Sequence, residues 1–317
     1  MTDKTEYAIE CSGLVKKFGS FTAVNSLDLR VKKGELFGFL GPNGAGKTTT
    51  IKMLTTLLTP TAGCAKVAGY DLAEESAFVR AKIGVVPQEF ALFEELSPAE
   101  NLWYIGELFG MKKDYLKKRT EELLRTVNLY EKKDVRSEGF SGGMKQRLSV
   151  AAGLMHTPDI LFMDEPTTGL DPQSRIALRE LTQRLNASGM TVIYTTHDME
   201  EADKLCERIA VMDKGRVIAL GTGQELKRTH GGYQRMTLSL SRHDESLARE
   251  LSKLVGAKEH LYRDGRIDLF LSGDPSEAVR AVIPFLSKKK IDIHDMNVRE
   301  PTLEEVFINL TKKDVRD

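Results

Sequence analysis

A glycine-rich loop between an apolar run and a helical segment constrains this chain more than any other feature. The apolar run Leu36–Leu40 stops at a turn, and a helical pattern starts near Lys47. The loop matches the pattern GxxxxGK[ST], in which glycines let successive backbone N–H groups point at a phosphate beside a helix N-terminus. The predicted nucleotide-binding residues are Gly41, Pro42, Asn43, Gly44, Ala45, Gly46, Lys47, Thr48 and Thr49.

The side chains at the end of this loop indicate ATP and Mg²⁺ as cofactors. Lys47 is expected to neutralise the β- and γ-phosphates, and the Thr48 hydroxyl is expected to ligate Mg²⁺. A chance glycine turn is the alternative interpretation. The strand before the loop and the helix after it favour a nucleotide site.

A second apolar run, Ile160–Met163, ends in two acids. The carboxylate of Asp164 is placed to hold Mg²⁺, and Glu165 can polarise the attacking water as a general base. Alone, an apolar strand that ends in acids is usually structural. Downstream of a phosphate loop, the catalytic interpretation is the better one.

The first 220 or so residues alternate strand-like and helix-like segments. Apolar runs such as Leu36–Leu40 and Thr191–Tyr194 are continuous rather than alternating, which is typical of strands covered on both faces. We therefore expect an α/β core with a parallel sheet. A helix is expected from the glycine-rich loop through Leu58, and another from Pro98 towards Phe109 with Ser97 as its N-cap.

The pattern of strand-like and helix-like segments changes near His230–Gly232, which we interpret as a hinge. We therefore expect domains at 1–229 and 230–317. The second part predicts a β-α-β-β-α-β order with an extra helix, a small α+β unit that resembles the ferredoxin-like fold. Its expected elements are strand Met236–Ser241, helix Glu245–Leu254, two strands flanking Asp264–Gly265, helix Pro275–Leu286, strand Ile291–Val298 and a helix from Thr302 to Leu310.

Composition excludes several classes of protein. The 317 residues carry 46 basic and 46 acidic side chains, so the formal net charge is zero. That balance argues against disorder and against a nucleic-acid binder that relies on positive charge. No run approaches the roughly 20 apolar residues of a membrane span. The polar N-terminus is not a signal peptide, and three dispersed cysteines suggest reduced, cytosolic thiols.

Further motifs identify the family. Phe140–Met144 resembles the signature loop of ABC ATPases, and Gln88 matches their Q-loop. Gly169–Asp171 matches the D-loop, and His197 in Thr195–Asp198 matches the switch histidine. The resemblance covers roughly residues 6 to 227, and the motifs fall in the family's order. It implies a P-loop NTPase cassette of the ABC type, with a mixed-sheet core and a helical subdomain at about 88–158.

The resemblance also implies roles for individual residues. Two cassettes of this family close head to tail over two ATPs, so Ser141, Gly142 and Gly143 would bind the γ-phosphate held by the other subunit. Gln88 would contact Mg²⁺ or water, and His197 would hold the γ-phosphate and the attacking water. The remaining roles are an adenine contact for Phe18 and a contact across the dimer interface for Asp171.

The wider resemblance is to the ATP-binding subunits of daunorubicin-resistance-type exporters. Phe140 and Met144 stand where the family more often has Leu and Gln, and the tail Glu300–Phe307 looks like that subgroup's extension. This implies an ATPase that drives export of a drug, lipid or other amphipathic substrate. The expected partners are a separate transmembrane permease and a second ATP-binding cassette. We expect the two cassettes to form a homodimer, and a heterodimer is the alternative. The expected location is the cytoplasmic face of the cell membrane, reached through the permease.

We expect the permease to dock between Gln88 and the helix that starts at Pro98. The candidate contacts are Phe90, Leu92, Phe93 and Trp103, because aromatic anchors dominate interface energies. The alternative is that several of these side chains fill the core.

Two other functions compete with transport. A non-transport ABC ATPase of DNA repair or translation is one, but such members usually carry a long coiled coil or a second cassette. A nucleotide-sensing scaffold without turnover is the other, and the presence of Glu165 and His197 argues against it.

Overall fold

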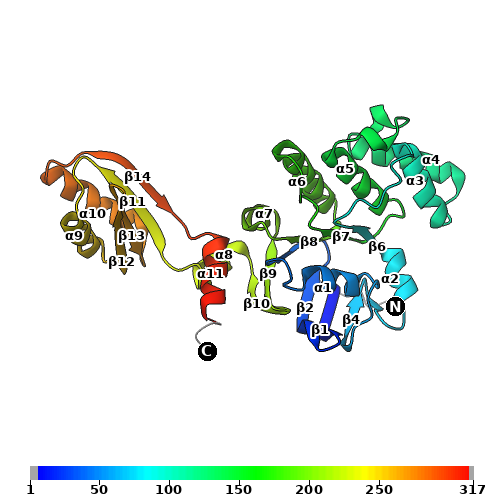
Figure 1. Cartoon of the computed structure of the whole chain (residues 1–317), viewed down its shortest axis with the longest axis horizontal. Helices are drawn as coiled ribbons and strands as arrows, with labels where there is room; N and C mark the ends of the chain where they lie inside the picture. Colours follow the sequence, from blue (N-terminus) through cyan, green and yellow to red (C-terminus); the bar gives the residue numbers. More distant parts are fainter. Residues whose placement is uncertain (1–5, 314–317) are drawn as a thin grey trace. The chain divides into compact units, whose positions relative to one another are not determined.

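The computed structural model describes residues 6–313 and divides into two compact units between Gly223 and Gln224 (Figure 1). The first unit holds an antiparallel sheet, a larger mixed sheet and the helices around them. The second unit holds one antiparallel sheet with its own helices.

The antiparallel sheet of the first unit has the strand order β2-β1-β4-β5. Its two long strands form a hairpin in which Phe18 pairs with Phe21 at the turn. This hairpin brings two aromatic side chains to one end of the sheet. The strands are β1 (Tyr7–Phe18), β2 (Phe21–Lys32), β4 (Ala62–Val67) and β5 (Tyr70–Asp71).

The second sheet of this unit has the order β10-β9-β3-β8-β7-β6 and is parallel except for its edge strand β10. Every residue of β3, β7 and β8 is buried, as the continuous apolar runs predicted. The predicted α/β core is thus confirmed. The strands are β3 (Leu36–Leu40), β6 (Ile83–Val86), β7 (Ile160–Asp164), β8 (Thr191–Thr196), β9 (Arg208–Asp213) and β10 (Arg216–Gly221).

Helices cover the sheets of this unit, and α3, α4 and α5 gather to one side of the six-stranded sheet (Figure 1). These three helices form the helical part expected from the family resemblance. The helices are α1 (Lys47–Leu54), α2 (Ser76–Lys82), α3 (Pro98–Leu108), α4 (Lys113–Thr126), α5 (Gly142–Gly153), α6 (Pro172–Ala187) and α7 (Met199–Leu205).

Local sequence sets the ends of two of these helices. At the start of α3, Ser97 accepts from Glu100 N while the Glu100 carboxylate accepts from Ser97 N, a complete capping box. The helix α1 is shorter than expected, because it ends at Leu54 and not at Leu58. Thr56 has a φ of 64° there, a left-handed conformation that an α-helix cannot contain.

The second unit contains the order β11-α9-β12-β13-α10-β14, with the sheet order β12-β13-β11-β14. This is the expected β-α-β-β-α-β arrangement. Its elements are β11 (Gln234–Leu240), α9 (Glu245–Val255), β12 (Glu259–Arg263), β13 (Arg266–Leu271), α10 (Pro275–Lys288) and β14 (Ile293–Arg299). Apolar side chains of strands and helices form a separate core, including Met236, Leu238, Leu240, Leu247, Leu251, Ile267, Leu269, Val282 and Leu286.

Two further helices, α8 (Gly223–His230) and α11 (Leu303–Lys313), flank this sheet in the sequence. The Asn309 amide donates to the His230 carbonyl at 3.0 Å, so the end of α8 is joined to α11. The boundary expected after residue 229 would assign α8 to the first unit, whereas its residues from Gln224 onwards lie in the second.

None of the helices between residues 6 and 313 is long and apolar enough to cross a membrane.

Candidate functional site

The predicted catalytic and phosphate-binding residues lie at one edge of the six-stranded sheet. The strands β6, β7, β8 and β3 run parallel and adjacent, so their carboxyl ends meet at the same edge. The glycine-rich loop follows β3, Gln88 follows β6, Glu165 follows β7 and His197 follows β8. Ligands of open α/β sheets bind at this edge.

Glycine is required in the loop for two reasons. Gly44 and Gly46 have φ values of 82° and 103°, which side chains other than glycine rarely adopt. A Cβ on Gly46 would also lie 2.6 Å from the carbonyl oxygen of Ala23, and one on Gly41 would lie 2.3 Å from that of Met212. The loop therefore packs its backbone directly on neighbouring backbone and opens its N–H groups at the start of α1.

The Lys47 side chain is buried and directed back along the loop. Its Nζ donates to the carbonyl oxygens of Gly41 and Pro42 at 2.7 and 3.1 Å. It also forms an ion pair with Glu165 Oε1 at 3.1 Å, and the Lys47 side chain is 3% exposed. The ammonium group is thus fixed between the loop and the acid that ends β7.

A threonine that the sequence analysis did not single out positions both acids. Thr195 Oγ1 donates to Asp164 Oδ1 at 2.6 Å and accepts from the Glu165 N–H at 2.8 Å. Thr48 Oγ1 donates to the same Asp164 oxygen at 3.2 Å. The signal in the sequence is a threonine near the end of an apolar strand, but only the β7–β8 register places it opposite Asp164.

Glu165 is held as a carboxylate in a strained backbone position. Its φ is 45°, and its Oε2 lies 3.0 Å from His197 Nδ1 and accepts from Thr168 Oγ1 at 3.3 Å. Burial favours the protonated acid, but hydrogen bonds and charge from Lys47, then from His197, outweigh it, so the pKa of Glu165 lies below its usual value. Glu165 is therefore ionised at neutral pH.

The loop, the acid and the Q-loop residue border one cavity of about 380 Å³. Phe21 lines it, whereas Phe18 is 48% exposed beneath the Lys16 ammonium and is not among the lining residues. Of the two aromatic residues at the hairpin turn, Phe21 faces the phosphate loop. The cavity is lined by Phe21, Ala23, Asn43, Gly44, Gly46, Lys47, Thr48, Thr49, Gln88 and Glu165.

The signature residues stand apart from this cavity, since Ser141, Gly142 and Gly143 are not among the described residues that line it. Ser141 is the N-cap of α5, and its Oγ accepts from Met144 N at 3.3 Å. Its side chain and Gly142 are exposed, so the start of α5 presents N–H groups to the outside.

Asp171 caps the neighbouring helix α6. Its carboxylate accepts from the Ser174 N–H at 3.0 Å and from the Ser174 hydroxyl at 2.6 Å. These two hydrogen bonds, the hydroxyl's first, lower the pKa of Asp171. The starts of α5 and α6 are thus both capped at the surface.

A buried carboxylate on α7 ties the segments around the site together. Glu201 accepts from the hydroxyls of Thr167 and Thr196 at 2.9 Å each and from that of Tyr194 at 3.0 Å. It is 5% exposed, and these neutral donors satisfy it. Sequence reasoning did not find this residue, because three donors from two segments meet only in the fold.

Comparison with known families agrees with this geometry. The family described as "ABC transporter" matches residues 24–168, and the C-terminal domain of DrrA1-3-like ATP-binding proteins matches residues 221–311. The linearmycin resistance ATP-binding protein LnrL of Bacillus subtilis (strain 168) is 40% identical over 98% of this chain and 100% of its own length. The daunorubicin/doxorubicin resistance ATP-binding protein DrrA of Streptomyces peucetius is 41% identical over 98% of this chain and 94% of its own.

Solved structures show the same fold over about two thirds of the chain. A structure of an ATP-binding subunit of an ABC transporter has a TM-score of 0.64 at 30% identity and covers 71% of this chain and 93% of its own. A dimeric ATP-binding cassette bound to ADP and Pi has a TM-score of 0.61 at 29% identity, covering 68% of this chain and 98% of its own. The chain therefore belongs to the ABC transporter ATP-binding proteins, and it is an ATPase that powers a transporter.

Proposed function

We propose that this ATPase hydrolyses Mg-ATP in a head-to-tail dimer and drives export of an amphipathic compound through a separate permease. The observation that carries the proposal is the convergence of Lys47, Gln88 and Glu165 on one cavity at the carboxyl edge of a parallel sheet. Export is supported by the full-length similarity to two proteins named for resistance to linearmycin and to daunorubicin and doxorubicin.

In this proposal the glycine-rich loop binds the phosphates and Phe21 or Phe18 stacks on the base. The N–H groups at the start of α1 favour negative charge, and the Lys47 ammonium adds a full positive charge beside them. The remaining loop residues, Pro42, Ala45 and Thr49 among them, shape the backbone that carries these N–H groups.

Hydrolysis requires a water molecule aligned with the γ-phosphate. Glu165 accepts a proton from this water as the water oxygen forms a bond to the γ-phosphorus. The bond between the γ-phosphorus and the oxygen that bridges to the β-phosphate breaks, and ADP and phosphate are released. His197, in contact with Glu165, holds the γ-phosphate and the water in line. Gln88, which follows the adjacent strand β6 at the same edge, would contact the same water or the metal.

The residues present fit a magnesium ion bound together with ATP. Mg²⁺ prefers oxygen ligands and is commonly held by one or two protein groups plus phosphates and water. The hydroxyl of Thr48 and the carboxylate of Asp164 lie 3.2 Å apart beside the phosphate loop, and Gln88 lines the same cavity. Thr48, Asp164 and Gln88 would hold the ion, which would supply charge neutralisation on the phosphates.

A second cassette completes the site in this proposal. The exposed N-terminus of α5, with Ser141, Gly142 and Gly143, is an anion-binding end that its own chain's phosphate loop does not use. Asp171 lies at the start of α6, next to that end, and would contact the partner. The dimeric cassette bound to ADP and Pi, 29% identical to this chain, supports the arrangement.

The permease is proposed to dock in an apolar groove of about 320 Å³ beside the Q-loop. Pro87 and Ala91 line it from the segment after β6, and Ile105 lines it from α3. Phe109 directly follows α3, and Leu57 lies in the segment after α1. Phe109 is 48% exposed and stacks on His156 at 3.9 Å between ring centroids. An exposed aromatic ring at the rim of an apolar groove suits a helix of a partner protein.

The predicted contacts Phe90 and Phe93 are 38% and 47% exposed, and neither of them lines this groove. Phe93 packs edge-on against Tyr104 at 4.9 Å. Leu92 and Trp103 are half-buried, and the Trp103 indole donates to Glu107 at 3.0 Å. The exposed pair, Phe90 and Phe93, are the better candidates for direct contact.

The proposal is tested with Glu165→Gln in the full chain. We expect phosphate release to fall by at least about a hundredfold, because the proton acceptor is lost. ATP should still bind and should now hold a stable dimer in size-exclusion chromatography with light scattering. Glu180→Gln, an exposed change on α6, is the control. Full turnover in Glu165→Gln would refute the role of Glu165, and mass spectrometry of proteins co-purified from native membranes tests the permease.

A further inference from the structure

The sheet of the second unit has one face that its helices cover and a second face that carries polar and charged side chains. The covered face holds the separate apolar core, which includes residues of α9 and α10. Because successive side chains of a strand point to opposite sides, alternate residues of each strand form the second face. The strand registers place twelve of them in three rows, which together we call the outer face: Glu259, Phe270, Arg235 and Arg299 in the first row, Leu261, Asp268, Thr237 and Asn297 in the second, and Arg263, Arg266, Ser239 and Asp295 in the third.

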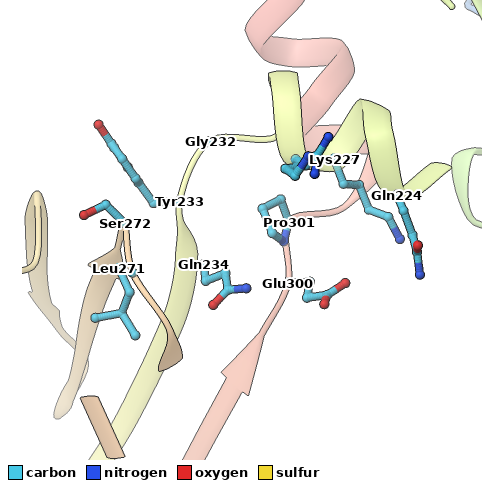
Figure 2. Close-up of a pocket in the computed structure, with 11 residues that line it drawn as sticks. Gln224, Lys227, Gly232, Tyr233, Gln234, Leu271, Ser272, Glu300 and Pro301 are labelled. Atoms are coloured by element: carbon cyan, nitrogen blue, oxygen red, sulfur yellow. The ribbon is translucent and has the colours of Figure 1, made fainter. Parts of the chain in front are cut away.

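The first row lies at the end of the sheet that borders a pocket of about 430 Å³. Gln234, Leu271 and Glu300, each next in sequence to a residue of this row, line the pocket together with residues of α8. Figure 2 shows these three residues at the ends of β11, β13 and β14, with α8 on the other side of the pocket. The second and third rows of the outer face therefore extend away from α8.

The side chains along the edges of the outer face are accessible. Leu261 is 47% exposed, and the Arg263 side chain is 78% exposed. Glu259, Arg266 and Asp295 are exposed as well. An exposed leucine between charged side chains gives a partner apolar area to bury and charges to pair with.

The centre of the outer face is neutral. Arg235 and Thr237 both donate hydrogen bonds to the carboxylate of Asp268, which is 5% exposed. The Arg235 guanidinium also lies 5.9 Å from the centroid of the Phe270 ring. The charges that decide which surface fits the outer face are therefore those at its corners.

The four corners of the outer face carry alternating charges. Glu259 and Arg263 lie on the edge strand β12, and Arg299 and Asp295 lie on the opposite edge strand β14. The first row thus has an acid at the β12 edge and an arginine at the β14 edge, and the third row has the reverse. Neither acid forms an ion pair with another residue between 6 and 313.

Both corner arginines can bind a further carboxylate. Arg263 contacts its neighbour Asp264 at 3.5 Å, but the two side chains are 78% and 88% exposed, and such pairs contribute little to stability. Arg299 donates to Glu305 at 2.8 Å with one of the five N–H groups of its guanidinium. Arg266, next to Arg263 in the third row, adds a second positive charge at that end.

This charge pattern is complementary to itself. A two-fold axis parallel to the strands places β12 opposite β14 of a second copy, so that Glu259 faces Arg299 and Asp295 faces Arg263. A two-fold axis across the strands places the first row opposite the third, so that Glu259 faces Arg263 and Asp295 faces Arg299. Either two-fold arrangement brings each acid opposite an arginine, as an isologous interface requires.

We propose that the outer face binds the outer face of a second copy of this chain. Two sheets that pack face to face lie about 10 Å apart, a gap that opposed arginine and glutamate side chains span. Alternating charges disfavour a nucleic acid, which needs an accumulation of positive charge. The contact is separate from the head-to-tail dimer proposed for the nucleotide sites, and it forms without nucleotide, so either dimer can be wrong alone.

Sedimentation velocity of the full chain without nucleotide tests the association. Twelve side chains are about half of the 20 to 30 residues that each partner contributes to a standard interface, so the dimer should be weak. We expect a dissociation constant of about 10 to 100 μM in about 50 mM NaCl. In about 500 mM NaCl it should rise at least about threefold, because salt screens exposed charge pairs.

Two double variants test the charge pattern. Glu259→Lys with Asp295→Lys makes all four corners positive, and Arg263→Glu with Arg266→Glu makes the third row negative. Each variant alone should associate at least about tenfold more weakly than the wild type, because like charges then face each other. An equimolar mixture should form a heterodimer, identified by its mass in native mass spectrometry, and its formation would show that both variants are folded.

Glu250→Lys with Glu277→Lys is the matched control. It changes the net charge as much as Glu259→Lys with Asp295→Lys does, but at exposed positions of α9 and α10, the helices of the covered face. It should dimerise like the wild type. An equal loss in this control would overturn the proposal, since net charge and not the outer face would then decide association. A wild-type chain that stays monomeric at about 0.5 mM, or a mixture without heterodimer, would also overturn it.

Discussion

Gly143 at the start of α5 packs directly against Ser174 of α6: a Cβ on Gly143 would lie 2.1 Å from the Ser174 hydroxyl oxygen and 2.5 Å from its Cβ. The same hydroxyl is held by Asp171 at 2.6 Å. The signature glycine therefore has a packing role besides the anion-binding role that its motif implies. The signature and the D-loop aspartate are connected through one serine.

Gly143→Ala should accordingly destabilise the protein by about 1–3 kcal/mol, because the added methyl group must displace Ser174. Urea unfolding followed by circular dichroism measures the change. Ser174→Gly removes both clashing atoms, so the double variant should recover much of the loss. Equal stability of Gly143→Ala and the wild type would contradict this packing.

Thr195→Val should lower kcat for ATP hydrolysis by about 10- to 100-fold with little change in KM, since the isosteric change removes the group that positions Asp164 and Glu165. Thr191→Val is a matched control at the other end of β8, where Thr191 Oγ1 accepts from the Gly34 N–H at 2.9 Å. A steady-state phosphate assay compares the two. Similar losses of kcat in both variants would show a general effect on the strand rather than a catalytic one.

Phe21→Ala should weaken binding of a fluorescent ATP analogue by about fivefold to tenfold if its ring stacks on the base. Phe18→Ala is the natural comparison, because the two rings are cross-strand partners and only Phe21 lines the cavity. A larger effect from Phe18→Ala would assign the adenine contact to Phe18, as the family resemblance implies.

Phe109→Glu should abolish co-purification with the permease, because a charge enters the apolar groove. ATP hydrolysis by the isolated subunit should stay within about twofold of wild type, since Phe109 does not line the nucleotide cavity. Tyr115→Glu, equally exposed on α4 and outside the groove, is the control. Retained co-purification of Phe109→Glu would place the permease elsewhere.

The lowered pKa of Glu165 predicts how stability changes with pH. A folded-state pKa below the ordinary value of 4.5 means that ionised Glu165 contributes stability above pH 4.5, which is lost as pH falls through the folded-state value. The free energy of unfolding of wild type relative to Glu165→Gln should therefore be constant near neutrality and decrease below about pH 4.5. Parallel urea titrations at several pH values measure it, and a difference independent of pH would contradict the ion pair with Lys47.

Features encoded in short segments could be predicted from the sequence. The phosphate loop, the capping box of Ser97 and Glu100 and the acids at the end of β7 each depend on neighbouring residues. The order of strands and helices in the second unit was predictable for the same reason, because each element has its own periodicity.

Features that depend on strand register could not be predicted. Thr195 becomes important only because β8 pairs with β7 so that it faces Asp164. Phe21 and Phe18 are equivalent in the sequence, and the hairpin decides which one borders the cavity. The end of α1 at Leu54 was missed because a left-handed threonine is not recognisable from residue type.

The shared attachment of Thr167 and Thr196 to Glu201 has a mechanical consequence. Thr167 follows Glu165 by two residues, and Thr196 directly precedes His197. One carboxylate thus fastens both segments, so a displacement of α7 would move Glu165, the proposed proton acceptor, together with His197. The segments that carry Glu165 and His197 are thus linked through one side chain outside the nucleotide cavity.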